Sequence, residues 1–176
     1  IGVPWLAKQG YEADDIIETI AKEVKKKQLH PPLETIIVSG DQDAFQLIDN
    51  RTKVYTMRKG MQDTVLYDEV ALEKRFDGLK PEQIVDFKAL RGDPSDNIPG
   101  VKGVGEKTAT QLLSDFGSME SLYKALEGKK EVSGISVKLQ ETLLQEKDIA
   151  FLSKELATID LAVPLDFSLP ELLWKG

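Results

Sequence analysis

The run Thr35-Ile36-Ile37-Val38-Ser39 constrains the fold more than any other stretch, because it is short, β-branched and almost wholly apolar. Such a run is typical of a strand buried on both faces, as in parallel sheets. Residues 11–27 precede it with apolar positions at helical spacing. Two further strand-like runs, 53–57 and 64–67, follow it on either side of a Lys59-Gly60 turn. Alternating strands and helices predict an α/β fold with a partly parallel sheet flanked by helices.

From residue 68 onward the spacing of apolar residues becomes helical. Asp68 is placed to cap the first helix of this part, and Pro81 opens the second. The helices are expected over residues 69–76, 81–90, 106–116, 118–126 and 137–156. We therefore predict an α/β portion over 1–67, a helical portion over 68–160, and an exit strand or linker over 161–176.

The composition narrows the possible chemistry. The chain has no cysteine, which excludes disulfides, thiolate metal sites and cysteine nucleophiles. Its one histidine, His30, lies beside Pro31 in a predicted loop and is interpreted as a solvated residue, which excludes a Ser-His-Asp relay or a histidine-rich zinc site. No apolar stretch approaches the roughly 18 residues that a membrane-spanning helix needs. Any catalysis must therefore rely on carboxylates.

Acidic residues gather at three junctions between predicted elements. They are Glu12, Asp14 and Asp15 at a helix start, Asp41 and Asp43 after the strand, and Asp93 and Asp96 in a glycine-rich turn. Each group has an ordinary structural explanation, because acids in a first helical turn offset the dipole and Asp caps loops and helix starts. The second group has a further feature, since ligands of open α/β sheets bind beyond the carboxyl ends of strands.

Taken together, the seven carboxylates predict a metal centre. No basic partner is expected near them, so they would repel one another if the fold brought them together without cations. Carboxylate oxygens without His or Cys favour Mg²⁺ or Mn²⁺, and two such ions can activate water for phosphodiester hydrolysis. On this interpretation Asp41→Asn and Asp93→Asn lower metal affinity without destabilising the metal-free chain. Bound cations would also offset part of the net charge of −7, which alone disfavours nucleic acid.

A glycine hairpin predicts contact with a nucleic-acid backbone. Gly103-Val104-Gly105 leads directly into a helix, so backbone N–H groups at the helix start can approach a phosphate. Lys102, Lys107 and Thr108 flank the turn and are further candidate DNA contacts. This is the helix-hairpin-helix pattern, placed here over residues 92–116, which holds the DNA backbone without reading bases. The alternative is a hairpin that only mediates packing.

Three ordered motifs carry a resemblance to a known family. They are Tyr11-Glu12-Ala13-Asp14-Asp15, Ser39-Gly40-Asp41-Gln42-Asp43, and the run from Arg91-Gly92-Asp93-Pro94-Ser95-Asp96-Asn97 to Gly103-Val104-Gly105-Glu106-Lys107-Thr108-Ala109. Over nearly the whole chain, the sequence resembles the 5′-nuclease domain of bacterial DNA polymerase I. It resembles flap endonucleases and phage 5′-exonucleases more loosely.

The resemblance implies a PIN-like nuclease core followed by a helix-two-turn-helix region that holds duplex DNA. It implies removal of 5′ flaps and RNA primers at nicked or primer-junction duplexes in replication and repair. The family's ligands for two metal ions would fall on Glu12, Asp14, Asp15, Asp41, Asp43, Asp93 and Asp96. A K⁺ ion held by backbone carbonyls at the hairpin is also implied, together with a polymerase domain in the same parent chain, a monomeric state, no membrane contact, and a bacterial cytoplasm and nucleoid.

The chain opens on Ile1-Gly2-Val3-Pro4-Trp5 without Met, and we expect an N-terminal segment to be missing. In the family that segment supplies two further aspartate ligands, a core strand and a basic helical arch, so the core would be incomplete. An alternative is therefore a DNA-binding fragment that holds duplex through the hairpin and cuts nothing. A third reading is an unrelated acidic α/β scaffold. Lys22, Lys25, Lys26, Arg58 and Lys59 are either DNA contacts or solvated charges.

Overall fold

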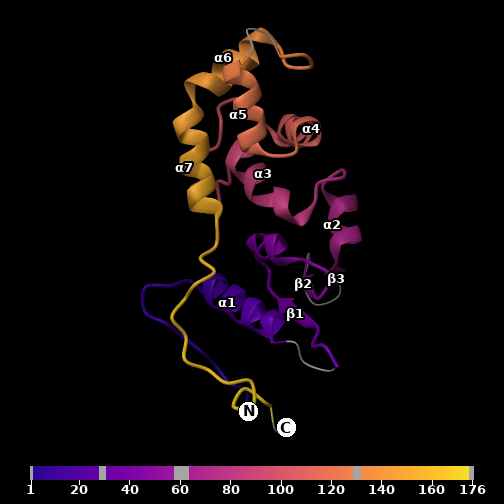
Figure 1. Ribbon diagram of the computed structural model, residues 1–176, viewed down its shortest axis with the longest axis vertical. Coiled ribbons are helices and arrows are strands. Elements are labelled where there is room, and N and C mark those ends of the chain that lie inside the picture. Colours follow the sequence, from indigo (N-terminus) through magenta and orange to yellow (C-terminus); the bar gives the residue numbers. More distant parts are fainter. Residues whose placement is uncertain (1, 28–30, 58–63, 129–131, 175–176) are drawn as a thin grey trace.

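The computed structural model describes residues 2–27, 31–57, 64–128 and 132–174, so His30, Arg58 and the Lys59-Gly60 turn lie outside the described residues. The helices and strands run in the order α1 (Ala13–Lys26), β1 (Thr35–Val38), η1 (Asp43–Leu47), β2 (Thr52–Met57), β3 (Thr64–Tyr67), α2 (Glu69–Arg75), η2 (Pro81–Gln83), α3 (Ile84–Arg91), α4 (Glu106–Phe116), α5 (Met119–Gly128), α6 (Val137–Gln145) and α7 (Lys147–Ala157). In Figure 1 the sheet and α1 lie towards one end and α4–α7 towards the other.

The sheet has three strands in the order β1-β2-β3, with β1 parallel and β3 antiparallel to β2. The predicted partly parallel sheet is therefore present. The expected burial of β1 on both faces is wrong, because Ile36 and Val38 are 53% and 66% exposed while Ile37 is buried. The exposed face continues across β2 and β3 through Tyr55 and Leu66. No described helix covers this face, so only alternate positions of β1 enter the core.

A chain of aromatic side chains joins the sheet to the helical layer. The rings of Phe45 and Tyr67 have centroids 4.7 Å apart, those of Phe45 and Phe76 6.0 Å, and those of Phe76 and Phe87 5.5 Å. All four residues belong to one continuous core cluster that extends to Leu143. The sheet and the helices thus share a core, which fixes the position of η1 relative to α3.

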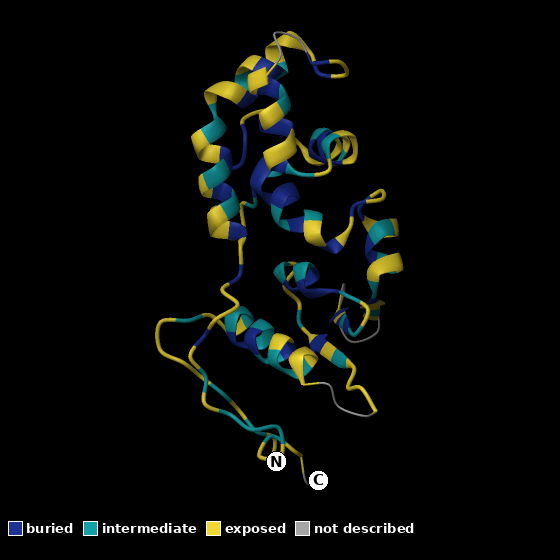
Figure 2. Ribbon diagram, in the orientation of Figure 1, coloured by how far each residue is buried: buried dark blue, intermediate teal, exposed yellow. Residues whose placement is uncertain are grey.

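Helix α3 lies at the centre of the helical portion, packed against α4 and α7, and is buried along most of its length (Figure 2). It buries two charged residues, Asp86 and Lys88, besides its apolar ones. Asp86 has partners in α5 and α7. Its carboxylate accepts the Met119 N–H at 2.8 Å and pairs with Lys154 at 2.6 Å. The buried charges of α3 are therefore paired rather than isolated.

One expectation for the C-terminal region is wrong. The single helix expected over 137–156 is two helices, α6 and α7, separated at Glu146. No proline or glycine marks that break; Glu146 leaves helical geometry where its carboxylate accepts the Lys102 N–H at 2.6 Å. Of the two alternatives for residues 161–176, an exit strand or a linker, the described residues form no strand and include a turn over 169–172, which leaves the linker. No helix in the described part of the chain combines the length and apolar character needed to cross a membrane.

Candidate metal centre and nucleic-acid interface

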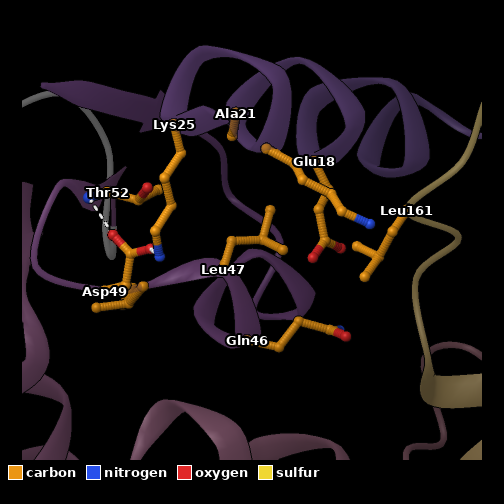
Figure 3. Close-up of a pocket in the computed structure, with 10 residues that line it drawn as sticks. Glu18, Ala21, Lys25, Gln46, Leu47, Asp49, Thr52 and Leu161 are labelled. Atoms are coloured by element: carbon orange, nitrogen blue, oxygen red, sulfur yellow. Dashed lines mark hydrogen bonds and ion pairs between the residues drawn. The ribbon is translucent and has the colours of Figure 1, made fainter. Parts of the chain in front are cut away.

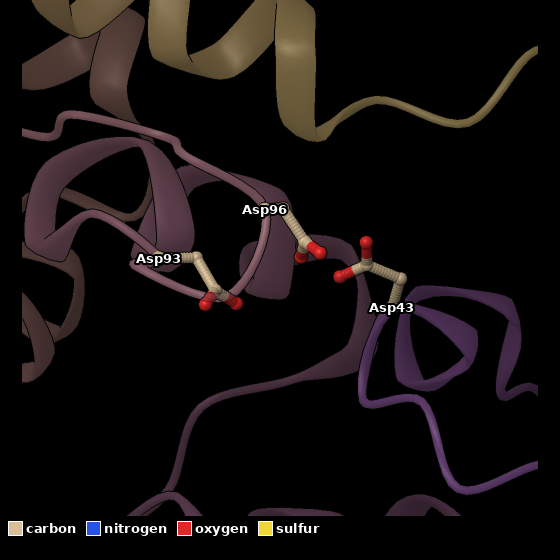
Figure 4. Close-up of side chains that lie close together, drawn as sticks. All are labelled: Asp43, Asp93 and Asp96. Carbon is tan, nitrogen blue, oxygen red and sulfur yellow. The ribbon is translucent and has the colours of Figure 1, made fainter.

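Three of the predicted ligands meet between the two portions of the chain. Asp43 begins η1, whereas Asp93 and Asp96 lie on the loop that follows α3. One carboxylate oxygen from each lies within 4.8 Å of the other two (Figure 4). Residues about fifty positions apart in the sequence thus form one cluster of oxygen donors, called here the aspartate trio.

A lysine lies inside the aspartate trio, so the expectation of carboxylates without a basic partner is wrong. Lys88 is 4% exposed, and its Nζ lies 2.9 Å from Asp93 Oδ2 and 3.6 Å from Asp96 Oδ2, and pairs with Asp43 Oδ1. Sequence reasoning missed this residue. One signal was available, because Lys88 is four residues after Ile84 on the apolar face of the predicted helix, where a charge needs a partner.

The charge balance differs between the trio and Asp14. Burial disfavours the charged form of Asp93, yet hydrogen bonds from Ser95 and Lys88 and the charge of Lys88 lower the pKa of Asp93 to about 2. Burial raises the pKa of Asp14, and the charges of Asp41, Glu12 and Asp15 raise it further. The repulsion predicted from the sequence therefore acts on Asp14, while Asp93 is stabilised as an anion.

The first acidic group shares a cavity with Asp43, one member of the trio. A cavity of about 300 Å³ is lined by Glu12, Asp14, Asp15 and Asp43, together with residues 156–160 at the end of α7 and just after it. Asp43 thus belongs both to this cavity and to the trio. Asp41 is connected to Asp43 through the backbone, because its Oδ1 accepts the Asp43 N–H at 3.0 Å.

Asp15 has a structural role that the sequence left open. Its Oδ2 accepts the Glu12 N–H at 3.0 Å at the start of α1, which is the capping interpretation. Its Oδ1 accepts the Asp160 N–H at 2.8 Å, which attaches the segment after α7 to α1. With both oxygens engaged, Asp15 is less free to turn toward a cation than Asp14.

The loop that carries Asp93 and Asp96 is held by its backbone. Asp93 and Ile98 exchange both backbone hydrogen bonds at 2.9 Å, forming an isolated bridge. Gly100 donates its N–H to the hydroxyl of the fully buried Ser153 at 3.1 Å. Ser95 donates its N–H at 3.0 Å and its hydroxyl at 2.5 Å to Asp93 Oδ1. Asp93 therefore caps its own loop and also faces Lys88.

The glycine hairpin has the geometry of an anion site. Gly103 has φ +79°, and Gly105 precedes α4 without any side-chain cap. Among the described residues, no acceptor bonds the first-turn N–H groups of Glu106, Lys107 and Thr108. These N–H groups are free to bind an anion at the positive end of the helix dipole.

Two of the predicted DNA contacts are restricted by the structure. The Val104 side chain is 4% exposed and belongs to the core, so only its backbone can face a ligand. Lys102 is exposed, but its N–H is bonded to Glu146. Two basic residues of α1 are also engaged: Lys25 pairs with Asp49 at 2.5 Å and Lys26 with Glu23. These pairs favour the solvated-charge interpretation for Lys25 and Lys26.

A second cavity, of about 290 Å³, lies between α1 and the segment from η1 to β2 (Figure 3). Glu18 points into it, and its Oε2 is buried without a hydrogen-bond partner among the described residues. Burial raises the pKa of Glu18 to about 7, with Lys22 opposing and Asp15 reinforcing the shift. This cavity is separate from the aspartate trio and is lined by none of the seven predicted metal ligands.

Comparison with known proteins gives the class of this chain. Residues 1–77 match the family described as 5′-3′ exonuclease, N-terminal resolvase-like domain, and residues 79–176 match 5′-3′ exonuclease, C-terminal SAM fold. The chain belongs to the 5′-3′ exonuclease family, a family of nuclease hydrolases, as the resemblance implied. The reading as an unrelated acidic scaffold is wrong.

Its relatives are DNA polymerases. The chain is 47% identical over 166 residues to DNA polymerase I of Bacillus subtilis, which covers 94% of this chain and 18% of that protein. It is 41% identical over 177 residues to DNA polymerase I of Lactococcus lactis, covering 100% of this chain and 19% of that protein. The chain thus spans about a fifth of the length of these relatives.

Solved structures confirm the predicted fold class. A T5 5′-exonuclease with bound divalent metal ions (zinc) matches with a TM-score of 0.70 at 22% identity, over 90% of this chain and 53% of that one. The bacteriophage T5 flap endonuclease in a pseudo-enzyme-product complex with DNA and metal ions matches with a TM-score of 0.69 at 22% identity, over 89% of this chain and 52% of that one.

The donor set of the trio fits a hard divalent cation. All three side chains offer carboxylate oxygens, and no nitrogen or sulfur ligand lies in the cluster found among the described residues. Mg²⁺ and Mn²⁺ prefer such oxygen ligands. The raised pKa of Asp14 marks an adjoining place where added positive charge would relieve repulsion.

Proposed function

We propose that this chain is part of a metal-dependent 5′-3′ exonuclease and flap endonuclease that hydrolyses DNA at 5′ flaps, nicks and primer junctions. We place it within a DNA polymerase I that acts in replication and repair, with the polymerase domain in the same parent chain. The observation that carries the proposal is the meeting of Asp43 from the α/β portion with Asp93 and Asp96 from the helical portion. The family membership supports it.

The seven carboxylates would together be the ligands of two Mg²⁺ or Mn²⁺ ions. Asp43, Asp93 and Asp96 would hold one side of the centre, and Asp14 and Asp41, with Glu12 and Asp15, the other. Bound divalent ions supply an activated water and neutralise charge that develops on the phosphate. The short backbone links from Asp41 to Asp43 and from Asp93 to Ile98 hold these side chains in place before the ions bind.

The glycine hairpin positions the substrate. Its free N–H groups at the start of α4 would bind backbone phosphates of the duplex, with Gly103, Gly105, Lys107 and Thr108 at the contact. A K⁺ ion at the hairpin carbonyls belongs to the same proposal. Because the hairpin contacts and the carboxylates are different residues, we expect that mutations can separate DNA holding from cutting.

One observation favours a second function, a duplex-binding module that does not cut. Lys88 already offsets part of the negative charge of the aspartate trio without metal, whereas the hairpin N–H groups remain free. Such a module would bind duplex with strong salt dependence and show no cleavage.

A labelled 5′-flap duplex separates the two functions. Cleavage is measured with Mg²⁺, with Mn²⁺ and with excess EDTA, using the chain alone and a longer polypeptide that extends it as its relatives do. The proposal expects metal-dependent cleavage by the longer polypeptide that Asp93→Asn abolishes. Gly103→Val should weaken duplex binding about ten-fold and leave Mn²⁺ binding unchanged, because φ +79° strains any residue with a Cβ. Duplex binding without cleavage by either polypeptide would support the second function.

A further inference from the structure

Lys88 is the residue that the proposed metal centre does not yet explain. A buried ammonium is costly unless several anions compensate for its lost hydration. The three carboxylates of the aspartate trio provide that compensation. Lys88 is thus located where the oxygens of three predicted metal ligands converge, rather than beside one of them.

The surroundings hold the Lys88 side chain in that position. Its neighbours Phe87 and Ala89 are buried at 1% and 0% exposure, and α3 is packed against both η1 and α7. Lys88 itself is 4% exposed, so its side chain is enclosed by these elements. The ammonium is therefore a built-in feature of the site and not a surface charge that happens to lie nearby.

We propose that Lys88 is an internal counter-ion of the aspartate trio, which occupies the position of a divalent cation in the metal-free protein and competes with that cation for the same oxygens. The inference rests on the proposed metal-dependent function. Lys88 keeps Asp43, Asp93 and Asp96 together when metal is scarce. A cation that binds the trio must displace the ammonium or share its oxygens, which weakens metal affinity.

The effect of the Lys88 charge on the pKa values of nearby carboxyl groups agrees with this role. It contributes to lowering the pKa of Asp93 and opposes the rise in the pKa of Asp14, so it acts on both sides of the centre. A divalent cation among the same carboxylates would act in the same direction with twice the charge. Lys88 is a positioning residue, because its effect on the reaction passes through the aspartates.

The test compares Lys88→Met with the wild-type protein, since methionine keeps most of the length of the side chain and removes its charge. Mn²⁺ binding is measured by titration calorimetry, and melting temperature with and without Mn²⁺ by circular dichroism. We expect Lys88→Met to melt several degrees lower without metal, to bind Mn²⁺ about ten-fold more tightly, and to regain most of its lost stability at saturating Mn²⁺.

Lys154→Met is the matched control. Lys154 also pairs with acids, Asp86 and Glu120, but at the far side of α3 from the trio. Its removal should lower the melting temperature at all Mn²⁺ concentrations and leave Mn²⁺ affinity unchanged.

A measurement on the unmutated protein covers the case in which Lys88→Met does not fold. The ¹⁵N resonance of Lys88 Nζ, assigned by its loss in Lys88→Arg, should shift as Mg²⁺ is added and saturate with Mg²⁺ binding. Mn²⁺ binding to Lys88→Met that is equal to or weaker than wild type, or an Nζ resonance that ignores bound Mg²⁺, would overturn the counter-ion role alone. Absence of metal binding to both proteins would overturn the counter-ion role and the metal-dependent function together.

Discussion

The backbones of Gly92 and Gly100 touch at the base of the loop that carries Asp93 and Asp96. A Cβ placed on Gly100 would lie 2.2 Å from the Gly92 nitrogen, and one placed on Gly92 would lie 2.8 Å from the Pro99 carbonyl oxygen. Both glycines also have positive φ, +80° and +63° respectively. The aspartate trio therefore depends on a backbone contact that only two glycines permit.

Gly100→Ala should destabilise the protein by about 3 kcal/mol or more, because backbone atoms must move to admit the methyl group. It should also weaken Mn²⁺ binding, since Asp93 and Asp96 move with the loop. The matched control is Gly134→Ala, which has φ +86° but nothing within 4 Å of its Cβ. That change should cost only about 1 kcal/mol and leave Mn²⁺ binding intact. Denaturant unfolding measures the free energy of unfolding of both variants. Equal losses of stability would refute the importance of the glycine contact.

Asp93→Asn and Asp14→Asn should have opposite effects on the metal-free protein. Asp93 has a folded pKa of about 2 against an ordinary 3.8, so its ionised form contributes roughly 2 kcal/mol to stability at neutral pH. Asp93→Asn should therefore lower the melting temperature, by roughly 5 °C. Asp14→Asn should raise it, because the pKa of Asp14 is raised by burial and neighbouring acids. Melting in EDTA at pH 7 measures both.

The lowered pKa of Asp93 also predicts a loss of stability in acid. Because the folded pKa is depressed, its contribution is present above about pH 4 and is lost as pH falls through about 2. Wild type should lose this part of its stability across that window, and Asp93→Asn should not. A melting temperature unaffected by Asp93→Asn would contradict the stabilising role of ionised Asp93 and would support the repulsion between carboxylates that the sequence predicts.

The raised pKa of Glu18 predicts the opposite dependence of stability on pH. Burial raises the folded pKa of Glu18 from 4.5 to about 7, with Asp15 adding to the shift and Lys22 opposing it. The folded state then holds a proton that the unfolded state has released, so stability is greatest below about pH 4.5 and falls as pH rises to about 7. In metal-free buffer, Glu18→Gln should abolish this loss. Glu23→Gln, a change on the same helix but outside the cavity that Glu18 lines, should preserve it.

Glu146→Gln should strengthen duplex binding. The Glu146 carboxylate accepts the Lys102 N–H at 2.6 Å and so places a negative charge beside the hairpin that would bind phosphates. Glutamine can keep the hydrogen bond and removes the charge, so affinity should rise by about three-fold at low salt and by less at high salt. Fluorescence anisotropy with a labelled duplex measures this. Glu141→Gln, an exposed change on α6, is the control and should have little effect.

The local sequence pattern was enough to predict most of the helices and strands. The helical spacing before residue 27, the strand-like runs that became β1, β2 and β3, and the Asp68 cap, whose carboxylate accepts the Ala71 N–H at 2.9 Å, were all predictable because each depends on residues a few positions apart. The break at Glu146 was not, because no nearby proline or glycine marks it and the Glu146 carboxylate contacts Lys102, forty-four residues earlier. The exposed face of β1 was missed for the same reason, since the run of apolar residues does not say what covers them.

The sequence by itself determined the family, the residue types of the site and the glycine hairpin, because these are encoded in short ordered motifs. Only the tertiary structure decided which acids meet. Packing of η1 against α3 brings Asp43 to Asp93 and Asp96 and places Lys88 among them. It also turns Asp15 toward the backbone of Asp160. The physical reason is that charge interactions depend on distances in space, and these distances are set by the shared core rather than by spacing along the chain.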